Sequence, residues 1–283
     1  MKICYWGTAA AEGIPALFCS CPRCKEARAK KGRFVRTRSQ LLFDDELLLD
    51  FNGDTYMHSL KYDFDLGKLK DVLVTHVHED HFYPEDILYR SKGFAPEVET
   101  PTLTFHGSGD LKDEYLYRTR NDYATIDSGR IAFHELECYK WYGIGEYKVA
   151  SMPATHGTHD PRVYAISRGG KTALILNDTG MMREENFDWL KEQKIKFDLV
   201  SYDCTGDLDD TEIVWGKNAC HMGFKNVLAT RKKLVEGGNY KPTTVDIVTH
   251  FTHNGKNSGY ETMKRAVEKE GFITTFDGME IEF

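Results

Sequence analysis

Long apolar runs are missing from this 283-residue sequence, and no stretch approaches the length of a membrane-spanning helix. A leader pattern is missing too, because the residues from Met1 to Gly7 read directly as a β-strand. We therefore expect a cytoplasmic protein with no membrane partner. Its seven cysteines are then expected in a reducing environment, where metal binding is a commoner role for cysteine than disulfide formation.

An excess of basic charge is also absent. The chain has 37 Lys and Arg residues against 44 Asp and Glu residues, and its formal net charge is −7. This balance gives no long-range attraction for nucleic acid, so a nucleic-acid partner is disfavoured, although a local basic patch stays open. The basic stretch from Lys25 to Arg38 is interpreted as a solvated helix and loop, with a binding role as the alternative.

Repeats and low-complexity linkers are the last features that the sequence lacks. Hydrophobic residues make up 41% of the chain and charged residues 29%, which is ordinary for a globular protein and argues against disorder. No change of composition marks a boundary. We therefore predict a single domain over residues 1–283.

Short apolar runs predict many strands, and amphipathic stretches predict helices. Strands are expected at residues 2–6, 40–43, 46–51, 72–74, 102–105, 132–137, 146–152, 162–167, 172–176, 197–202, 246–249, 272–275 and 279–283. Helices are expected at 55–62, 110–117, 184–192, 222–236 and 260–270. Local pairing is expected for 40–43 with 46–51, for the succession 132–137, 146–152 and 162–167, and for 272–275 with 279–283. The pattern favours an α/β fold in which two β-sheets pack face to face with helices outside.

Four potential metal ligands follow the apolar run 72–74 within six residues: His76, His78, Asp80 and His81. Side chains alternate along a strand, so His76 and His78 would point to the same side, and the other two would follow as the chain turns. A polar loop that happens to be rich in histidine is the alternative. Three of the 11 histidines lie in this short stretch, which favours metal binding.

Other apolar strands end in a residue that can bind metal. His156 follows the strand through Met152, Asp178 follows the strand that ends at Leu176, and His250 closes the strand from Asp246. Any one of these could be an ordinary hydrogen-bonded residue. Together with the first cluster they supply five imidazoles and two carboxylates, enough for two divalent ions with positions open for water and substrate.

The order of these residues resembles the metallo-β-lactamase-fold hydrolases. The resemblance rests on the motif His-x-His-x-Asp-His at residues 76–81, followed by His156, Asp178 and His250. It implies a four-layer αβ/βα sandwich with a dinuclear metal site at one edge of the sheets. It also implies a division of the ligands: His76, His78 and His156 on one ion, Asp80, His81 and His250 on the other, and Asp178 between them.

Two further segments resemble the PhnP-like phosphodiesterases of this fold. One is the loop of residues 7–15 with the cysteines that follow it, and the other is the C-terminal segment 276–281. The resemblance implies a separate structural zinc, held here by Cys19, Cys21, Cys24 and His253. Three thiolates and one imidazole make a closed tetrahedral zinc site, which fits such a role. Reduced thiols in a surface loop, or a redox pair, are the alternatives.

The segment 218–223 resembles the family position whose histidine contacts the substrate phosphate, and here that residue is His221. His221 could donate a proton to the leaving oxygen or neutralise charge on phosphorus, and a helix-capping role is the alternative. Asp80 is grouped with it as a candidate catalytic residue. Asp50 and Asp203 end strands, where they could orient ligating histidines or serve the core.

We hypothesise that the protein hydrolyses a small or cyclic phosphodiester, using hydroxide bound at two divalent ions. His and carboxylate ligands suit zinc, manganese or iron. A tRNA-processing type of endonuclease, a lactonase or esterase, and a non-hydrolytic PqqB-like protein of cofactor biosynthesis are the alternatives. A homodimer is kept as a hypothesis. The aromatic segment after residue 89 is expected to influence the substrate if it forms a lid, and to be a small core if it does not.

Overall fold

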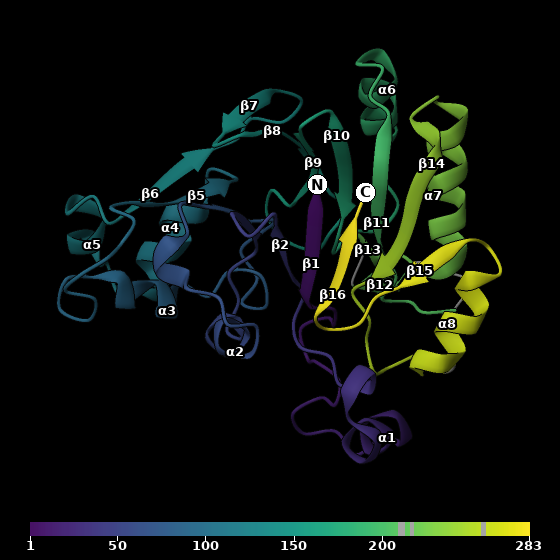
Figure 1. Cartoon of the computed structure of the whole chain (residues 1–283), viewed down its shortest axis with the longest axis horizontal. Coiled ribbons are helices and arrows are strands. Elements are labelled where there is room, and N and C mark those ends of the chain that lie inside the picture. The colour runs from purple at the N-terminus through teal and green to yellow at the C-terminus, as the bar shows by residue number, and fades with distance from the viewer. Residues whose placement is uncertain (209–212, 216–217, 256–258) are drawn as a thin grey trace.

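Two seven-stranded sheets face each other in the computed structural model, which describes residues 1–208, 213–215, 218–255 and 259–283 (Figure 1). In spatial order, the first sheet contains β16 (Met279–Glu282), β1 (Lys2–Gly7), β2 (Gln40–Phe43), β3 (Leu47–Leu49), β4 (Asp71–Leu73), β5 (Leu103–Gly107) and β6 (Ile131–Glu135). The second contains β15 (Phe272–Thr274), β14 (Tyr240–Thr249), β11 (Phe197–Asp203), β10 (Lys171–Leu176), β9 (Arg162–Arg168), β8 (Tyr147–Pro153) and β7 (Trp141–Ile144). A separate two-stranded ribbon is formed by β12 (Ile213–Trp215) and β13 (Asn218–His221).

The space between the two sheets is filled by apolar side chains from both. Ile3 and Tyr5 of the first sheet share one buried cluster with Ile166 and Ile175 of the second, and none of the four is more than 1% exposed. Face-to-face packing of this kind removes the inner side of each sheet from water, which is the main stabilising contribution to such a sandwich.

Helices cover the outer faces of both sheets. The first sheet packs against α2 (Thr55–Lys61), α3 (Pro84–Ile87) and α4 (Leu111–Arg118), and the second against α6 (Glu184–Glu192), α7 (Phe224–Glu236) and α8 (Tyr260–Glu268). The remaining helices are α1 (Pro22–Lys30), α5 (Tyr123–Asp127) and the 3₁₀ turns Gly32–Phe34, Leu66–Lys68 and Leu88–Arg90. In α8, Tyr260, Met263 and Val267 are buried along one face, the spacing expected of a helix that packs on a sheet. The predicted four-layer αβ/βα sandwich is confirmed.

The predicted partners of some strands were wrong. Strand β6 pairs in parallel with β5 in the first sheet, and the unpredicted β7 forms the hairpin with β8 instead. Strands β15 and β16 do not pair with each other, because β15 joins β14 in the second sheet and β16 joins β1 in the first. An apolar pattern indicates that a segment forms a strand, but it does not indicate which other strand will be its neighbour in a sheet. Among the described residues, no helix is long and apolar enough to cross a membrane.

Candidate metal centre

The predicted ligands lie where strands of both sheets end. His76 and His78 follow β4, His156 follows β8, Asp178 follows β10 and His250 follows β14. Asp178 and His250 have left-handed backbone conformations, with φ of 52° and 61°. Non-glycine residues adopt this region at some cost, and such conformations concentrate at functional sites. The chain therefore turns sharply at the strand ends, where these side chains converge.

A first group of four side chains converges as predicted, containing His76, His78, His156 and Asp178. Nε2 of His76 lies 2.9 Å from Nδ1 of His78, which lies 3.2 Å from Nε2 of His156. Two nitrogens bound tetrahedrally to one zinc ion at ordinary bond lengths stand about 3.3 Å apart. Nε2 of His76 is also 3.3 Å from Oδ2 of Asp178. The spacing of this group fits one divalent ion.

A second group shares Asp178 with the first and adds Asp80, His81 and His250. Nε2 of His81 lies 2.9 Å from Oδ2 of Asp178 and 3.2 Å from Oδ2 of Asp80. Nε2 of His250 lies 3.8 Å from the same Asp178 oxygen. Asp178 thus stands between the two groups, which is the position that a bridging ligand occupies. Glu or Asp at such a position can bind two ions at once because it has two oxygens.

Outer hydrogen bonds orient three of the histidine rings, those of His81, His156 and His250. Nδ1 of His81 lies 2.7 Å from Oδ2 of Asp50, and Nδ1 of His156 donates to the carbonyl of Cys220 at 3.1 Å. Nδ1 of His250 lies 2.8 Å from the hydroxyl of Thr205. In each ring the proton is held on Nδ1, so Nε2 presents its lone pair inward, as metal-binding histidines generally do.

Buried polar atoms that face only one another support a fit for metal ions. Nε2 of His81, Nε2 of His250 and Oδ1 of Asp178 are buried, and their ion-pair contacts are to other members of the cluster and to His221. Burial alone would raise the pKa of Asp178, but His156, His250 and His221 outweigh it and hold that pKa well below its ordinary value. An ionised carboxylate among inward-facing imidazole lone pairs is a set of donors that divalent ions satisfy.

His221 faces this cluster from the end of β13. Its Nδ1 lies 3.0 Å from Oδ1 of Asp178 and 3.0 Å from Oδ2 of Asp203, and its side chain is 18% exposed. Burial would lower the pKa of His221, but the carboxylates of Asp178 and Asp203 outweigh it and hold that pKa well above the ordinary value. The sequence placed His221 just before a helix, and the structure places it in a strand two residues before Gly223 caps α7.

The cysteine cluster lies apart from the histidine cluster and contains the four predicted residues, Cys19, Cys21, Cys24 and His253. Sγ of Cys21 lies 3.6 Å from Nδ1 of His253 and accepts a hydrogen bond from the amide of Cys24 at 3.4 Å. Sγ of Cys24 accepts one from the amide of Ala16 at 3.3 Å. Although burial opposes it, the amide of Cys24 and His253 lower the pKa of Cys21 to about 6. Burial and the other thiols raise the pKa of Cys24 to about 11, so a cation is needed to ionise this thiol. The four donors fit a closed zinc site.

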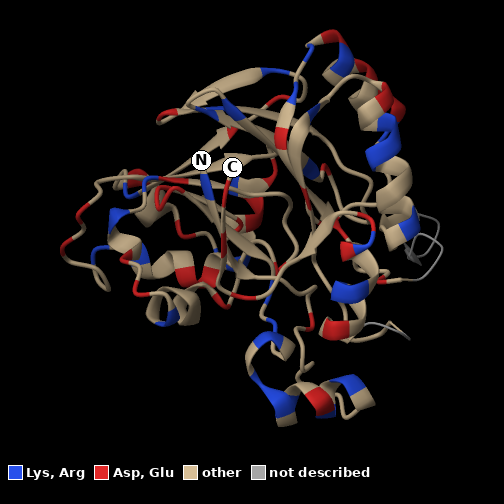
Figure 2. Ribbon diagram, turned by 45° about the vertical axis from the view of Figure 1, so that its right-hand side comes forward, with Lys and Arg blue, Asp and Glu red and all other residues tan. Residues whose placement is uncertain are grey.

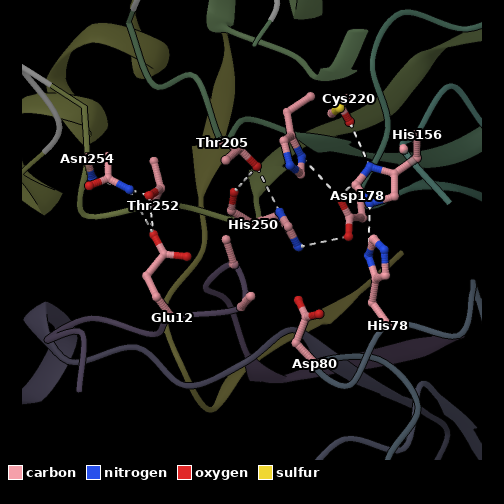
Figure 3. Close-up of a pocket in the computed structure, with 14 residues that line it drawn as sticks. Glu12, His78, Asp80, His156, Asp178, Thr205, Cys220, His250, Thr252 and Asn254 are labelled. Atoms are coloured by element: carbon pink, nitrogen blue, oxygen red, sulfur yellow. Dashed lines mark hydrogen bonds and ion pairs between the residues drawn. The ribbon is translucent and has the colours of Figure 1, made fainter. Parts of the chain in front are cut away.

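A cavity of about 430 Å³ opens beside the histidine cluster (Figure 3). Its wall includes His78, His156 and His221, and on another side Glu12 and Asn254. Sequence reasoning missed Glu12 and Asn254. The predicted cluster of three cysteines and His253 implies that the N-terminal loop lies beside the segment after β14, but no pattern in either segment marks these two side chains as reaching the cavity.

The aromatic residues after position 89 do not line this cavity. Tyr115 is fully buried in the cluster beneath the first sheet, and its hydroxyl donates to Asp122 at 2.7 Å. Tyr139 packs against the outer cluster of the second sheet, with its hydroxyl 2.8 Å from Asn186. Tyr117 is 81% exposed. The reading of this segment as a small core fits the structure, and the lid does not. His159 does not line the cavity either, because its side chain is exposed and pairs with Asp110.

Basic residues run along α1 and the turn after it, at the lower end of the molecule in Figure 2. Several of them serve the fold. Arg28 donates to the carbonyls of Cys19 and Ala16, Arg36 is 3% exposed, and Arg38 pairs with Asp54 at 2.9 Å. Because these basic side chains contact other parts of the protein, they favour a structural role for the basic stretch over a role in binding a partner.

Comparison with known proteins finds similarity at the level of structure alone. No family model matches the chain, and no curated protein matches it. Many solved structures are similar to this chain, and those that cover all of it include the following three. They are a diphosphatase from the PhnP family (17% identity, TM-score 0.74, 97% of its length), zinc-bound PqqB from Methylobacterium extorquens (18%, 0.74, 100%) and the metallo-β-lactamase-fold protein YhfI from Bacillus subtilis (17%, 0.67, 99%). The protein has the metallo-β-lactamase fold.

Proposed function

We propose that this protein is a metal-dependent hydrolase that cleaves a small or cyclic phosphodiester. The observation that carries the proposal is the convergence of seven ligand side chains beside one cavity, whose wall includes five of them together with His221. The likeness to a diphosphatase of the PhnP family supports chemistry at phosphorus. Zinc-bound PqqB has the same TM-score, so the fold does not separate hydrolysis from a role in cofactor biosynthesis, and the proposal rests on the side chains.

The proposed ligands divide as the two groups do. One ion would be held by His76, His78, His156 and Asp178, and the other by Asp80, His81, His250 and Asp178. Zinc, manganese or iron would each suit these donors. When bound, the ions would supply hydroxide near neutral pH and neutralise charge on the phosphoryl oxygens. Asp50 and Thr205 would keep His81 and His250 oriented for this role.

His221 is the proposed proton donor to the leaving oxygen. Because its Nδ1 lies against Asp203 and Asp178, Nε2 is the nitrogen available to a substrate in the cavity. Asp203 is fully buried and also accepts from the amides of Thr205 and Met222, which keeps this carboxylate in place behind the ring. A fixed imidazolium beside the scissile bond can transfer its proton as the alkoxide departs.

Replacing His221 by glutamine should lower kcat for an alkyl phosphodiester by about 10²–10⁴-fold, because the leaving alkoxide loses its proton donor. The loss should be much smaller for a p-nitrophenyl ester, whose leaving group is stable without a proton. Both rates are measured at steady state, with the metal content of each protein determined alongside. The matched control is His159→Gln, which should leave both rates unchanged. Equal losses on the two esters, or loss of an ion from the variant, would reject the role of proton donor.

A substrate panel tests the proposed function itself. Phosphodiesters, cyclic phosphates, lactones and tRNA precursors would be assayed with protein loaded separately with manganese and zinc. We expect turnover of phosphodiesters, whereas turnover confined to lactones or to tRNA precursors would favour the corresponding alternative. No turnover of any member by loaded protein would favour a PqqB-like role. Elemental analysis should find three metal ions per chain when both centres are filled.

A further inference from the structure

The wall of the cavity that holds Glu12 differs in chemistry from the metal-binding wall. Figure 3 shows Glu12, Thr252 and Asn254 on one side, with His78 and His156 on the opposite side. None of these three polar residues belongs to a ligand group of the described chain. This wall is built by two segments far apart in sequence, the loop after β1 and the segment after β14.

Backbone hydrogen bonds fix these two segments to each other. The amide of Ala10 donates to the carbonyl of Phe251 at 2.9 Å, and the amide of Phe251 donates to the carbonyl of Thr8 at 2.9 Å. Phe251 is fully buried, which keeps its neighbour Thr252 in place. The position of Glu12 over the cavity is therefore set by the fold and does not depend on a free loop.

Side-chain contacts fix the carboxylate of Glu12 in turn. Oε1 accepts from the hydroxyl of Thr252 and, at 3.4 Å, from Nδ2 of Asn254. Nε2 of His253 lies 3.7 Å from the same oxygen. Figure 3 shows the other oxygen, Oε2, directed toward the interior of the cavity. One oxygen thus anchors the group and the second is presented to whatever the cavity holds.

A carboxylate oxygen at this position selects for particular chemistry. It can only accept hydrogen bonds, and its charge repels a phosphate group. A donor on the substrate would bind it, and a cationic donor would bind best because charge-assisted hydrogen bonds are roughly twice as strong as neutral ones. No Phe, Tyr or Trp side chain is among the described residues that line the cavity, so the ring faces that best recognise quaternary ammonium are absent there. Ala10 and Ala11 add a small apolar surface to the lining of the cavity.

We propose that Glu12 is a specificity-determining residue and that the substrate carries a primary ammonium group on a short alkyl arm, which Oε2 of Glu12 binds while the phosphodiester lies at the histidine cluster. This inference rests on the proposed function, because it names the class of phosphodiester. The substrate would be a zwitterion, with the negative group at the metal-binding wall and the positive group at the wall of Glu12.

The test uses p-nitrophenyl phosphodiesters that differ only in their second ester group. Arms of two to four carbons carry a terminal ammonium, hydroxyl, trimethylammonium or methyl group, and kcat/KM is measured for each on the metal-loaded protein. We expect the ammonium ester of the best length to exceed the methyl-ended ester of that length by about tenfold or more. The gain should appear mainly in KM, because the arm lies away from the reacting phosphorus.

Glu12→Gln keeps the shape of the side chain and the acceptor for Thr252 but removes the charge. The preference for the ammonium ester should fall to about twofold or less, whereas a merely structural defect would lower all esters by one common factor. The matched control is Glu26→Gln, which replaces a carboxylate of α1 that pairs with Lys30 outside the cavity and should keep the preference. The affinities of ω-aminoalkylphosphonates and of alkylphosphonates, measured by calorimetry and compared, give a readout that does not depend on turnover.

Each outcome has a separate meaning. Equal kcat/KM for ammonium and methyl-ended esters at every arm length would overturn the assignment of Glu12 while leaving the hydrolase intact. A preference for the hydroxyl or trimethylammonium ester would show that the substrate does not carry a primary ammonium group. If Glu12→Gln kept the preference for the ammonium ester, the assignment of Glu12 as the residue that binds it would be rejected. If no ester were hydrolysed, and if phosphonates with and without the amine bound with equal affinity, both this inference and the proposed function would be rejected.

Discussion

Asp178→Asn should lower kcat/KM for phosphodiesters by about a hundredfold to several thousandfold and remove both ions from the histidine cluster. Asp178 belongs to both ligand groups, so one substitution weakens two sites. It is 3% exposed, and removing one partner from a buried ionic cluster costs about 3–5 kcal/mol, which corresponds to roughly a hundredfold to several thousandfold in rate. Turnover and metal content, both measured after loading with manganese or zinc, check the prediction.

The matched control for Asp178 is Asp198→Asn. Asp198 is likewise a buried carboxylate of the second sheet, but it accepts from Lys241 and from the amide of Thr172, far along the strands from the cluster. Its loss should lower stability and leave metal content unchanged. The cysteine cluster should keep its zinc in both variants. Two ions retained at the histidine cluster of Asp178→Asn would contradict the bridging role.

Cys24→Ser should remove one zinc ion per chain and lower the free energy of unfolding by more than about 4 kcal/mol, the range typical of a lost structural metal. The physical reason is that this cluster joins residues 19–24 to His253, across most of the chain. Cys24 is itself fully buried, so serine at this position would bury a hydroxyl group that has no zinc ion to bind. Zinc analysis and thermal unfolding check the result, with a fall in midpoint on the order of 10 °C expected.

Cys138→Ser is the control for this variant, since Cys138 is only partly buried and lies outside every ligand group of the described residues. It should keep the full zinc content and change stability little. If Cys24→Ser kept its zinc, or if wild-type protein never held more than two ions, the closed zinc site would be rejected. The cluster would then be a set of reduced thiols.

The convergence of the proposed ligands could be predicted because the signal of each is local. His76 and His78 lie two residues apart at the end of one strand, and Asp178 and His250 each follow an apolar run. Strand ends of a layered α/β fold meet along one edge, so the meeting of these side chains follows from the fold class. The layer order was likewise predictable, since it depends on where apolar strands and amphipathic helices occur.

The rest depended on long-range contacts that no local pattern encodes. Strand β16 could have paired with β15, its neighbour in sequence, and pairs instead with β1. Glu12 reaches the cavity only because its loop bonds to Phe251, some 240 residues away. The buried Tyr115 and the exposed Tyr117 belong to one aromatic segment, and only the packing of α4 distinguishes their environments.

The segment after β14 supplies His250 to one cluster and His253 to the other, with Thr252 between them bonded to Glu12. An ion at the cysteine cluster would hold this segment in place before any ion reaches the histidine cluster. Occupancy of the two centres would then be thermodynamically linked, each raising the affinity of the other by the same factor. Manganese titration of wild type against Cys24→Ser measures that factor, and equal affinities would show independent centres. Filling of the cysteine cluster would thus lower the metal concentration needed to fill the histidine cluster.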